Sequence, residues 1–364
     1  MKADAEIWEK GKRNMRFVHI ADVHLGAKPE EGKHLGIDRE KEIYECFKHV
    51  IRFCNQEEVD LLLIAGDLFH RQPLLRELKE INYYFEQLTQ TRVVMMAGNH
   101  DYISPRSNYI EFPWNENVYM FGSDEIDSIY FADIQTRVYG LSYFTRDIRE
   151  AKYDEIKPQN EQEVSILLAH GGDERDIPID KKKLVAAGFD YVALGHIHKH
   201  EFIAKNIAYA GSLEPLDKNE LGDHGLIYGN MTKEHQEFAF YPFSKRKYKI
   251  ITIQSDEKMT NAALKQSVLE QIHKKGINNL YRVMIEGRRE EQIEFDTEAL
   301  KKIGNVVEAL DHSRINYDFK ILKEENADNI IGLFIDRIQK ENVEAVVREK
   351  ALDIGLEALL HARE

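Results

Sequence analysis

Residues 61–67 read LLLIAGD. Five apolar residues followed by Gly66 and Asp67 are typical of a buried strand that ends in a turn. Similar apolar runs, closed by polar side chains that can bind a metal, start near positions 17, 93, 166 and 192. Amphipathic stretches with helical spacing separate several of these runs. Strands that alternate with helices predict an α/β domain with parallel strands.

The same patterns locate the elements of this domain. Strands are expected at residues 16–21, 60–65, 92–97, 138–141, 164–169, 191–195, 206–210, 225–230 and 236–241. Helices are expected at residues 38–55, 74–90 and 180–188. The strand pairs between residues 206 and 241 have the spacing of antiparallel hairpins.

The composition changes at residues 242–249, which read PFSKRKYK. Beyond this point we expect a small α/β module with strands at 248–254, 280–286 and 315–322 and helices at 259–275 and 296–303. From about residue 326 the apolar spacing predicts helices. The expected segments are a polar extension (1–15), an α/β domain (16–244), the small module (245–325) and a C-terminal helical segment (326–364).

The charge balance limits the possible partners. The 364 residues include 64 acidic and 50 basic side chains, which gives a net charge of −14. An autonomous nucleic-acid binder usually has a basic surface, and this chain lacks that footprint. The basic clusters at 181–183 and 245–247 are expected to be solvated starts of elements rather than a track for DNA.

No stretch of the sequence favours a membrane. The longest apolar runs, such as residues 61–65, are far shorter than the roughly 20 residues that span a bilayer. The N-terminus is polar through Asn14 and lacks the apolar centre of a signal peptide. We therefore expect a cytoplasmic protein with no membrane partner. Cys46 and Cys54 share one face of a predicted helix and are expected to be buried, reduced thiols.

The ends of the predicted strands carry candidate metal ligands. In an open α/β sheet the carboxyl ends of the strands line the ligand crevice, so these side chains are expected to converge. The candidates are Asp22, His24, Asp67, Asn99, His170, His196 and His198. Imidazole, carboxylate and amide oxygen without thiolate suit Mn, Fe or Zn. Seven ligands are too many for one metal that keeps an open position, but they fit two metals bridged by a carboxylate.

A single Asp-x-His or His-x-His is a weak signal, and it is the repetition at five strand ends that favours a metal site. Without such a setting, other histidines are expected on the surface or in the core: His19, His34, His49, His235, His273, His312 and His361. His200 and His224 are expected to lie behind the ligands or in solvent. Asp101 alone would be a turn cap.

The order Asp22-x-His24, Gly66-Asp67, Gly98-Asn99-His100, His170 and His196-x-His198 resembles the calcineurin-like metallophosphoesterase superfamily. Within it, the sequences around Asp22 and Asp67 resemble the SbcD-type nucleases that repair double-strand breaks. The resemblance implies a four-layer β-sandwich flanked by helices over 16–244, a capping domain for DNA recognition over 245–325 and C-terminal helices.

The resemblance also implies roles for the candidate residues. One metal would be held by Asp22, His24, Asp67 and His198, and the other by Asp67, Asn99, His170 and His196. Asp67 would bridge two divalent ions, with Mn²⁺ expected. His100 would orient the phosphate or protonate the leaving oxygen. Many phosphatases of the superfamily have Asp where this chain has His70, a change that favours a nuclease, although a solvent-facing His70 is the alternative.

The implied partners are DNA, a coiled-coil SbcC-type ATPase that docks on the C-terminal helices, and a second copy of the chain. The apolar spacing of those helices suits packing on their own domain or partner binding. The expected function is a two-metal DNA phosphodiesterase in DNA repair. A nucleotide or small-molecule phosphodiesterase and a non-catalytic scaffold are the alternatives. The loop at 102–109 could contact DNA or pack on the domain, and residues 213–224 match no pattern from which a role can be inferred.

Overall fold

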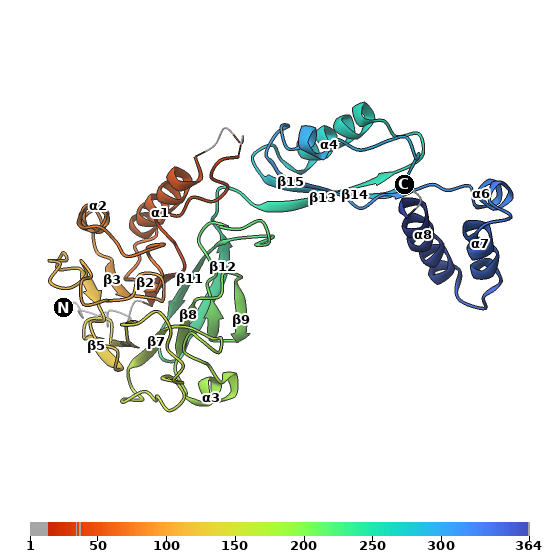
Figure 1. The fold of residues 1–364 in the computed structure, drawn as a ribbon. Helices are drawn as coiled ribbons and strands as arrows, with labels where there is room; N and C mark the ends of the chain where they lie inside the picture. Colours follow the sequence, from red (N-terminus) through yellow and green to blue (C-terminus); the bar gives the residue numbers. More distant parts are fainter. Residues whose placement is uncertain (1–13, 34, 36–37, 363–364) are drawn as a thin grey trace, which may run out of the picture. The chain divides into compact units, whose positions relative to one another are not determined.

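The computed structural model describes residues 14–33, 35 and 38–362, and two compact units divide the chain (Figure 1). The first unit consists of Met1–Gly32 and Gly36–Tyr248, and the second of Lys33–Leu35 and Lys249–Glu364. Residues 1–13 of the expected N-terminal extension lie outside the described residues.

The first unit contains two six-stranded mixed sheets. The order in the first sheet is β12-β11-β1-β2-β3-β4, where β1 to β4 are parallel and β11 and β12 are antiparallel additions. Its strands are β1 (Met15–Ile20), β2 (Leu61–Ala65), β3 (Arg92–Met96), β4 (Val118–Met120), β11 (Gly225–Met231) and β12 (Gln236–Pro242).

The order in the second sheet is β5-β6-β7-β8-β10-β9. Its four inner strands are parallel, and an antiparallel strand closes each edge. The strands are β5 (Asp127–Phe131), β6 (Thr136–Gly140), β7 (Val164–His170), β8 (Tyr191–Gly195), β9 (Glu201–Ala204) and β10 (Ile207–Tyr209).

Side-chain alternation along the strands explains the layers. Alternate residues of β2, such as Leu61 and Leu63, share a buried cluster with residues of the second sheet. The residues between them, such as Leu62, pack with α1 (Arg39–Gln56) and α2 (Leu75–Glu86). The expected α/β sandwich of two sheets flanked by helices is therefore confirmed. A short helix, α3 (Lys181–Ala186), precedes β8.

The strongly apolar elements follow the sequence expectations closely. Asp38 caps α1 by accepting from the Lys41 backbone N–H, and Cys46 and Cys54 are buried free thiols, as predicted. Three strands of the first unit are additions to the sequence prediction, namely β4, β5 and β9. They are short or half exposed, so their apolar pattern is weak.

The second unit contains a small sheet of order β13-β14-β15, and β16 also pairs with β14. Its α/β elements are β13 (Tyr248–Ser255), α4 (Asn261–Lys275), β14 (Leu280–Arg289), α5 (Thr297–Leu300), β15 (Val306–Asp311) and β16 (Arg314–Ile315). Three helices follow: α6 (Phe319–Glu325), α7 (Ile330–Lys340) and α8 (Ala345–His361). Figure 1 shows α4 lying along one face of this sheet.

The strand expected at 315–322 is wrong, because its second half, residues 319–322, forms the start of α6. Asp318 caps this helix by accepting from the backbone N–H groups of Lys320 and Ile321. Tyr317, Phe319 and Leu322 pack against the buried cluster of α7 and α8. The third strand of the sheet is instead β15, which the sequence pattern does not predict.

A buried network of ion pairs holds the end of the first unit. Arg246 donates to both carboxylate oxygens of Glu42 at 2.6–2.9 Å, and Arg39 bonds Glu42 at 2.8 Å and Glu214 at 3.1 Å. All four side chains are buried. The expectation that the cluster 245–247 is solvated is therefore wrong for Arg246. Its charge is neutralised by Glu42 of α1, which lies 204 residues earlier in the chain.

Replacement of Glu42 by Gln should lower the free energy of unfolding by about 3 kcal/mol, because two buried guanidinium groups lose a charged partner. Burial alone would raise the pKa of Glu42, but the hydrogen bonds from Arg246 and Arg39 lower it from 4.5 to about 2. The ionised Glu42 carboxylate thus contributes its full stabilisation of the fold above about pH 4.5, and this stabilisation is lost as the pH falls toward 2.

Denaturant unfolding of the wild type and of the Glu42 variant, at pH 7 and at several acid pH values, measures the difference in their free energies of unfolding. Glu45→Gln is the matched control, since Glu45 forms a half-exposed pair with Lys48 on the same helix, and it should cost less than about 1 kcal/mol. Equal losses in the two variants would contradict the proposed role of the buried network.

Candidate metal centre

The five predicted strand ends meet at one edge of the first unit. Asp22 and His24 follow β1, Asp67 follows β2, and Asn99 follows β3, which are neighbours in the first sheet. In the second sheet, His170 is the last residue of β7, and His196 and His198 follow the neighbouring strand β8. Because β2 packs against both β7 and β8, the carboxyl ends of the two sheets converge.

The backbone at these strand ends is strained. Asp22 and His24 have φ values of 49° and 50°, Asp67 has 50° and His196 has 95°, in the left-handed region that disfavours residues with a side chain. The Asp22 N–H donates to the Gly66 carbonyl at 3.2 Å, and the His24 N–H donates to the Asp67 carbonyl at 3.0 Å. Strain of this kind clusters at functional sites, because the turn fixes where the side chain points.

Glycines make room for the candidate ligands. A Cβ on Gly98 would lie 2.2 Å from Asp67 Oδ1, and a Cβ on Gly66 would lie 2.4 Å from His170 Nδ1. A Cβ on Gly195 would lie 1.9 Å from the Ala65 carbonyl oxygen. No larger residue fits at these three positions without moving the backbone or a candidate ligand.

A first cluster forms around His24. Its Nε2 lies 3.1 Å from His198 Nε2 and 3.7 Å from Asp67 Oδ2. Asp22 also offers an oxygen within 4.8 Å of ligand atoms of both histidines. The structure therefore brings together the four residues that the resemblance assigns to one metal.

A second cluster forms around His170. Its Nε2 lies 2.9 Å from Asn99 Oδ1 and 3.6 Å from Asp67 Oδ2. The His196 ring centroid is 5.3 Å from that of His170. His196 Nε2 lies 3.0 Å from Asp173 Oδ2, so its Nδ1 is the ring atom left for a metal. Asp67 Oδ2 lies within 4 Å of a ring nitrogen in each cluster, His24 Nε2 in the first and His170 Nε2 in the second.

The donor atoms of the second cluster fit a cation. His170 Nδ1 lies 2.8 Å from the Ala65 carbonyl oxygen, which can only accept, so Nδ1 carries the proton. Nε2 of neutral His170 then presents a lone pair to Asn99 Oδ1, which is also an acceptor. Two acceptors at 2.9 Å repel each other unless a positive charge lies beside them.

The electrostatics of the buried carboxylates also fit cations. Asp22 and Asp67 are almost completely buried, and burial raises the pKa of both. Within residues 14–33, 35 and 38–362, neither forms an ion pair with lysine or arginine; each accepts a backbone N–H, of His196 and His100 respectively. Burial lowers the pKa of His24 and His170, which favours the neutral form that binds metals.

Asp101 orders the turns around the site, as its expected role as a turn cap suggests. It accepts from the backbone N–H groups of Phe69 at 3.1 Å and Gly98 at 2.8 Å, and from the Tyr109 hydroxyl at 2.8 Å. Burial raises its pKa to about 6. Asp101 thereby links the turn that carries Asp67 to the turn after β3.

His100 and His70 lie at the open side of the clusters. His100 Nδ1 donates to the His70 carbonyl at 3.1 Å, which leaves Nε2 free to act on a substrate. The two rings stack with centroids 5.3 Å apart. His70 Nδ1 also lies 3.4 Å from His24 Nδ1, so the second imidazole touches a candidate ligand as well as His100.

Three acidic residues behind the ligands were not found from the sequence. Glu220 accepts from His198 Nδ1 at 2.7 Å, and Asp173 accepts from His196 Nε2 at 3.0 Å. Asp176 Oδ2 lies 3.9 Å from the same His196 atom. Burial of His198 acts to lower its pKa, but the hydrogen bond to Glu220 and the nearby charge of Asp22 outweigh burial and raise that pKa above its usual value. No sequence pattern marked these three residues, because each lies in an irregular loop.

The other polar residues near the site take modest roles. Ser107 is buried, and Asn108 donates to the Pro73 carbonyl at 2.9 Å, so these two residues of the loop at 102–109 pack on the domain. His224 bonds Ser212, whereas the His200 ring stacks on Phe240. His34 and the side chain of His361 lie outside the described residues.

Gly98→Ala should displace the Asp67 carboxylate and abolish tight binding of at least one metal ion, because the new Cβ would overlap Asp67 Oδ1. Metal analysis after dialysis against Mn²⁺ measures the number of bound ions. Gly122→Ala is the control, since a Cβ there meets nothing within 4 Å. Full metal content in the Gly98 variant would show that the carboxylate is not a ligand.

Comparison with known proteins agrees with this geometry. The model of the calcineurin-like phosphoesterase family matches residues 15–200, about half of the chain. The matched region contains every candidate ligand together with His70 and His100. The protein YhaO of Bacillus subtilis, described as an uncharacterized metallophosphoesterase, is 28% identical over 298 residues, 75% of this chain and 72% of YhaO.

Other similar proteins are described as nucleases or DNA repair proteins. The DNA double-strand break repair protein Mre11 of Methanocaldococcus jannaschii is 31% identical over 245 residues, 63% of each chain. The SbcD component of the nuclease SbcCD of Staphylococcus epidermidis is 28% identical over 239 residues, 55% of this chain and 61% of that protein. This chain therefore belongs to the calcineurin-like phosphoesterase family and is a metal-dependent phosphoesterase related to the Mre11 and SbcD nucleases.

Proposed function

We propose that this protein is a two-metal DNA phosphodiesterase, an exonuclease or endonuclease of DNA repair, with Mn²⁺ as its activating ion. The observation that carries the proposal is the position of Asp67. Its Oδ2 lies 3.7 Å from His24 Nε2 and 3.6 Å from His170 Nε2, between the two clusters. A carboxylate in that position suits a bridging ligand of a dinuclear site. Neutral imidazoles and hard oxygens are a donor set that Mn²⁺ accepts.

The proposed chemistry is hydrolysis of a phosphate diester. Two divalent ions, when bound, supply a water of lowered pKa and neutralise charge on the phosphate oxygens. The chain holds them through the seven ligands. His100 faces the substrate, because its Nδ1 is occupied by the His70 carbonyl and its Nε2 is free to orient the phosphate or protonate the leaving oxygen.

The choice of DNA rests on the relatives, whose names describe DNA repair proteins and a nuclease. A net charge of −14 argues against tight DNA binding by the isolated chain, so the metals and a partner must supply much of the attraction. We assign residues 16–244 to the nuclease domain and residues 245–325 to a capping domain that recognises DNA. A nucleotide phosphodiesterase would use the same ligands, and substrate assays separate the two.

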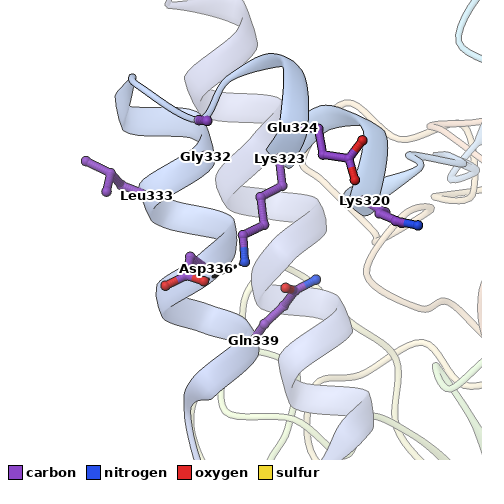
Figure 2. Close-up of a pocket in the computed structure, with 8 residues that line it drawn as sticks. Lys320, Lys323, Glu324, Gly332, Leu333, Asp336 and Gln339 are labelled. Atoms are coloured by element: carbon purple, nitrogen blue, oxygen red, sulfur yellow. Dashed lines mark hydrogen bonds and ion pairs between the residues drawn. The ribbon is translucent and has the colours of Figure 1, made fainter.

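We further propose that residues 326–364 bind a coiled-coil ATPase of the SbcC type. Ile330 and Leu333 of α7 are each 66% exposed, and Val346 of α8 is 75% exposed. Figure 2 shows a pocket at α6 and α7, lined by Leu333 and by a pair in which Lys323 and Asp336 point toward each other. Apolar side chains at such exposure suit a helix-in-groove contact.

A homodimer is also part of the proposal. The helix α2 and its N-cap present apolar side chains to solvent, with Leu75 48% and Tyr83 60% exposed. Ile110, in the loop after β3, is 46% exposed. Apolar groups of this kind are available for contact with a second copy.

Asp67→Asn should lower Mn²⁺-dependent hydrolysis of linear duplex DNA and of bis-p-nitrophenyl phosphate roughly 10³-fold or more, since both metal positions lose a charged ligand. His100→Ala should lower the rate constant about 10²- to 10⁴-fold while the metals stay bound. Glu234→Gln, at an exposed position, is the control. Cleavage of nucleotides with no cleavage of duplex DNA would favour the alternative substrate.

Leu333→Asp should weaken binding of the purified ATPase at least about tenfold, because it places a charge in the proposed contact. Hydrolysis of bis-p-nitrophenyl phosphate by the isolated chain should stay unchanged. The matched control is Ile277→Asp, because Ile277 is 59% exposed but lies outside the C-terminal helices. Equal binding of the ATPase by both variants would remove α7 from the interface.

A further inference from the structure

The loop at 211–224 joins β10 to β11 and lies between the metal centre and the end of the first unit. Its first residues contact the candidate ligands, and its last residues contact residues 243–248, which we call the exit segment because the chain leaves the first unit there. No pattern in the sequence predicts a role for this loop. Its hydrogen bonds on the two sides indicate one.

On the metal side, the loop is bound to the ligand turns. Ser212 forms a parallel bridge with Ala21, the residue before Asp22, and its N–H donates to the His198 carbonyl at 2.9 Å. Glu220 Oε1 accepts from His198 Nδ1 at 2.7 Å. This contact fixes the tautomer of His198 with its lone pair on Nε2, the atom that faces His24.

Glu220 is itself held in place. Its second carboxylate oxygen accepts from the Ser212 hydroxyl at 3.3 Å and from the Leu216 backbone N–H at 2.8 Å. His224 Nδ1 lies 2.8 Å from the same Ser212 hydroxyl. The carboxylate that orients His198 is therefore fixed by the two ends and the middle of its own loop.

On the other side, the loop holds the exit segment. The His224 carbonyl accepts from the N–H groups of Phe243 and Ser244 at 2.9 and 3.0 Å. Leu221 forms a bridge with Tyr248, and Asp223 pairs with Lys247. The exit segment thus runs along the same residues that surround Glu220.

Buried charges anchor this arrangement to α1. Glu214 of the loop accepts from the Lys245 N–H at 2.5 Å and pairs with Arg39. Arg246 of the exit segment pairs with Glu42, which also pairs with Arg39. A displacement of the exit segment must therefore break buried ion pairs or move the loop with it.

We propose that Glu220 is a positioning residue for His198 and that the loop at 211–224 transmits the position of the exit segment to this metal ligand. A displacement of the exit segment then changes the affinity of one metal ion. The inference rests on the metal centre proposed above and concerns its regulation. It requires no particular substrate.

The first test is Mn²⁺ binding by the metal-free chain, followed by titration calorimetry. Glu220→Gln keeps the size of the side chain but removes its charge. It should lower the affinity for one of the two Mn²⁺ ions roughly 10- to 100-fold. Glu220→Asp should recover part of the affinity, and Glu234→Gln should leave it unchanged. Wild-type affinities in Glu220→Gln would overturn the positioning role.

The second test examines the transmission. Arg246→Gln releases the exit segment from Glu42 and should weaken the same ion roughly 3- to 10-fold. In the double variant with Glu220→Gln, the loss of Mn²⁺ binding free energy should be smaller than the sum of the two single losses, since both substitutions act through one loop. Unchanged Mn²⁺ affinity in Arg246→Gln, or full additivity, would overturn the coupling. Because no substrate is present, failure here is distinct from failure of the nuclease assay.

Discussion

Two carboxylates are buried where β1 and β2 end, and among residues 14–33, 35 and 38–362 neither pairs with a lysine or an arginine; the rest of the first unit is arranged around them. Beside Asp22 and Asp67, the ring nitrogens of His24 and His198 lie 3.1 Å apart, and His170 Nε2 lies 2.9 Å from the amide oxygen of Asn99. In a low-dielectric site this arrangement is unfavourable unless cations occupy it. The demand for positive charge explains how a strongly acidic chain can act as a phosphoesterase, whose substrate is itself an anion.

The fold supports that centre through local strain and close packing. Left-handed turns at Asp22 and Asp67 aim the carboxylates inward, and glycine at position 98 leaves room for one of them. Asp101 ties two of the turns together. Behind the histidines, Glu220 and Asp173 fix the ring orientations. The candidate metal centre thus depends on backbone geometry as much as on the identity of its donor residues.

The convergence of the candidate ligands was predictable, because each lies at or just after the end of a strongly apolar strand and the rule of strand ends needs no tertiary detail. Glu220 and Asp173 were not predicted from the sequence, since each contacts its histidine from an irregular loop more than 20 residues away. Alternating apolar residues at 315–322 fit a strand or a short capped helix equally, and packing decided for the helix. Arg246 was misjudged because its partner Glu42 is distant in sequence.

The central claim is that Asp67 lies between two bound cations. Anomalous diffraction at the manganese edge from crystals grown with Mn²⁺ tests it most directly. A dinuclear site should give two peaks about 4 Å apart, one beside His24 and His198 and the other beside His170 and Asn99, with the Asp67 carboxylate between them. A single peak, or peaks away from Asp67, would contradict it.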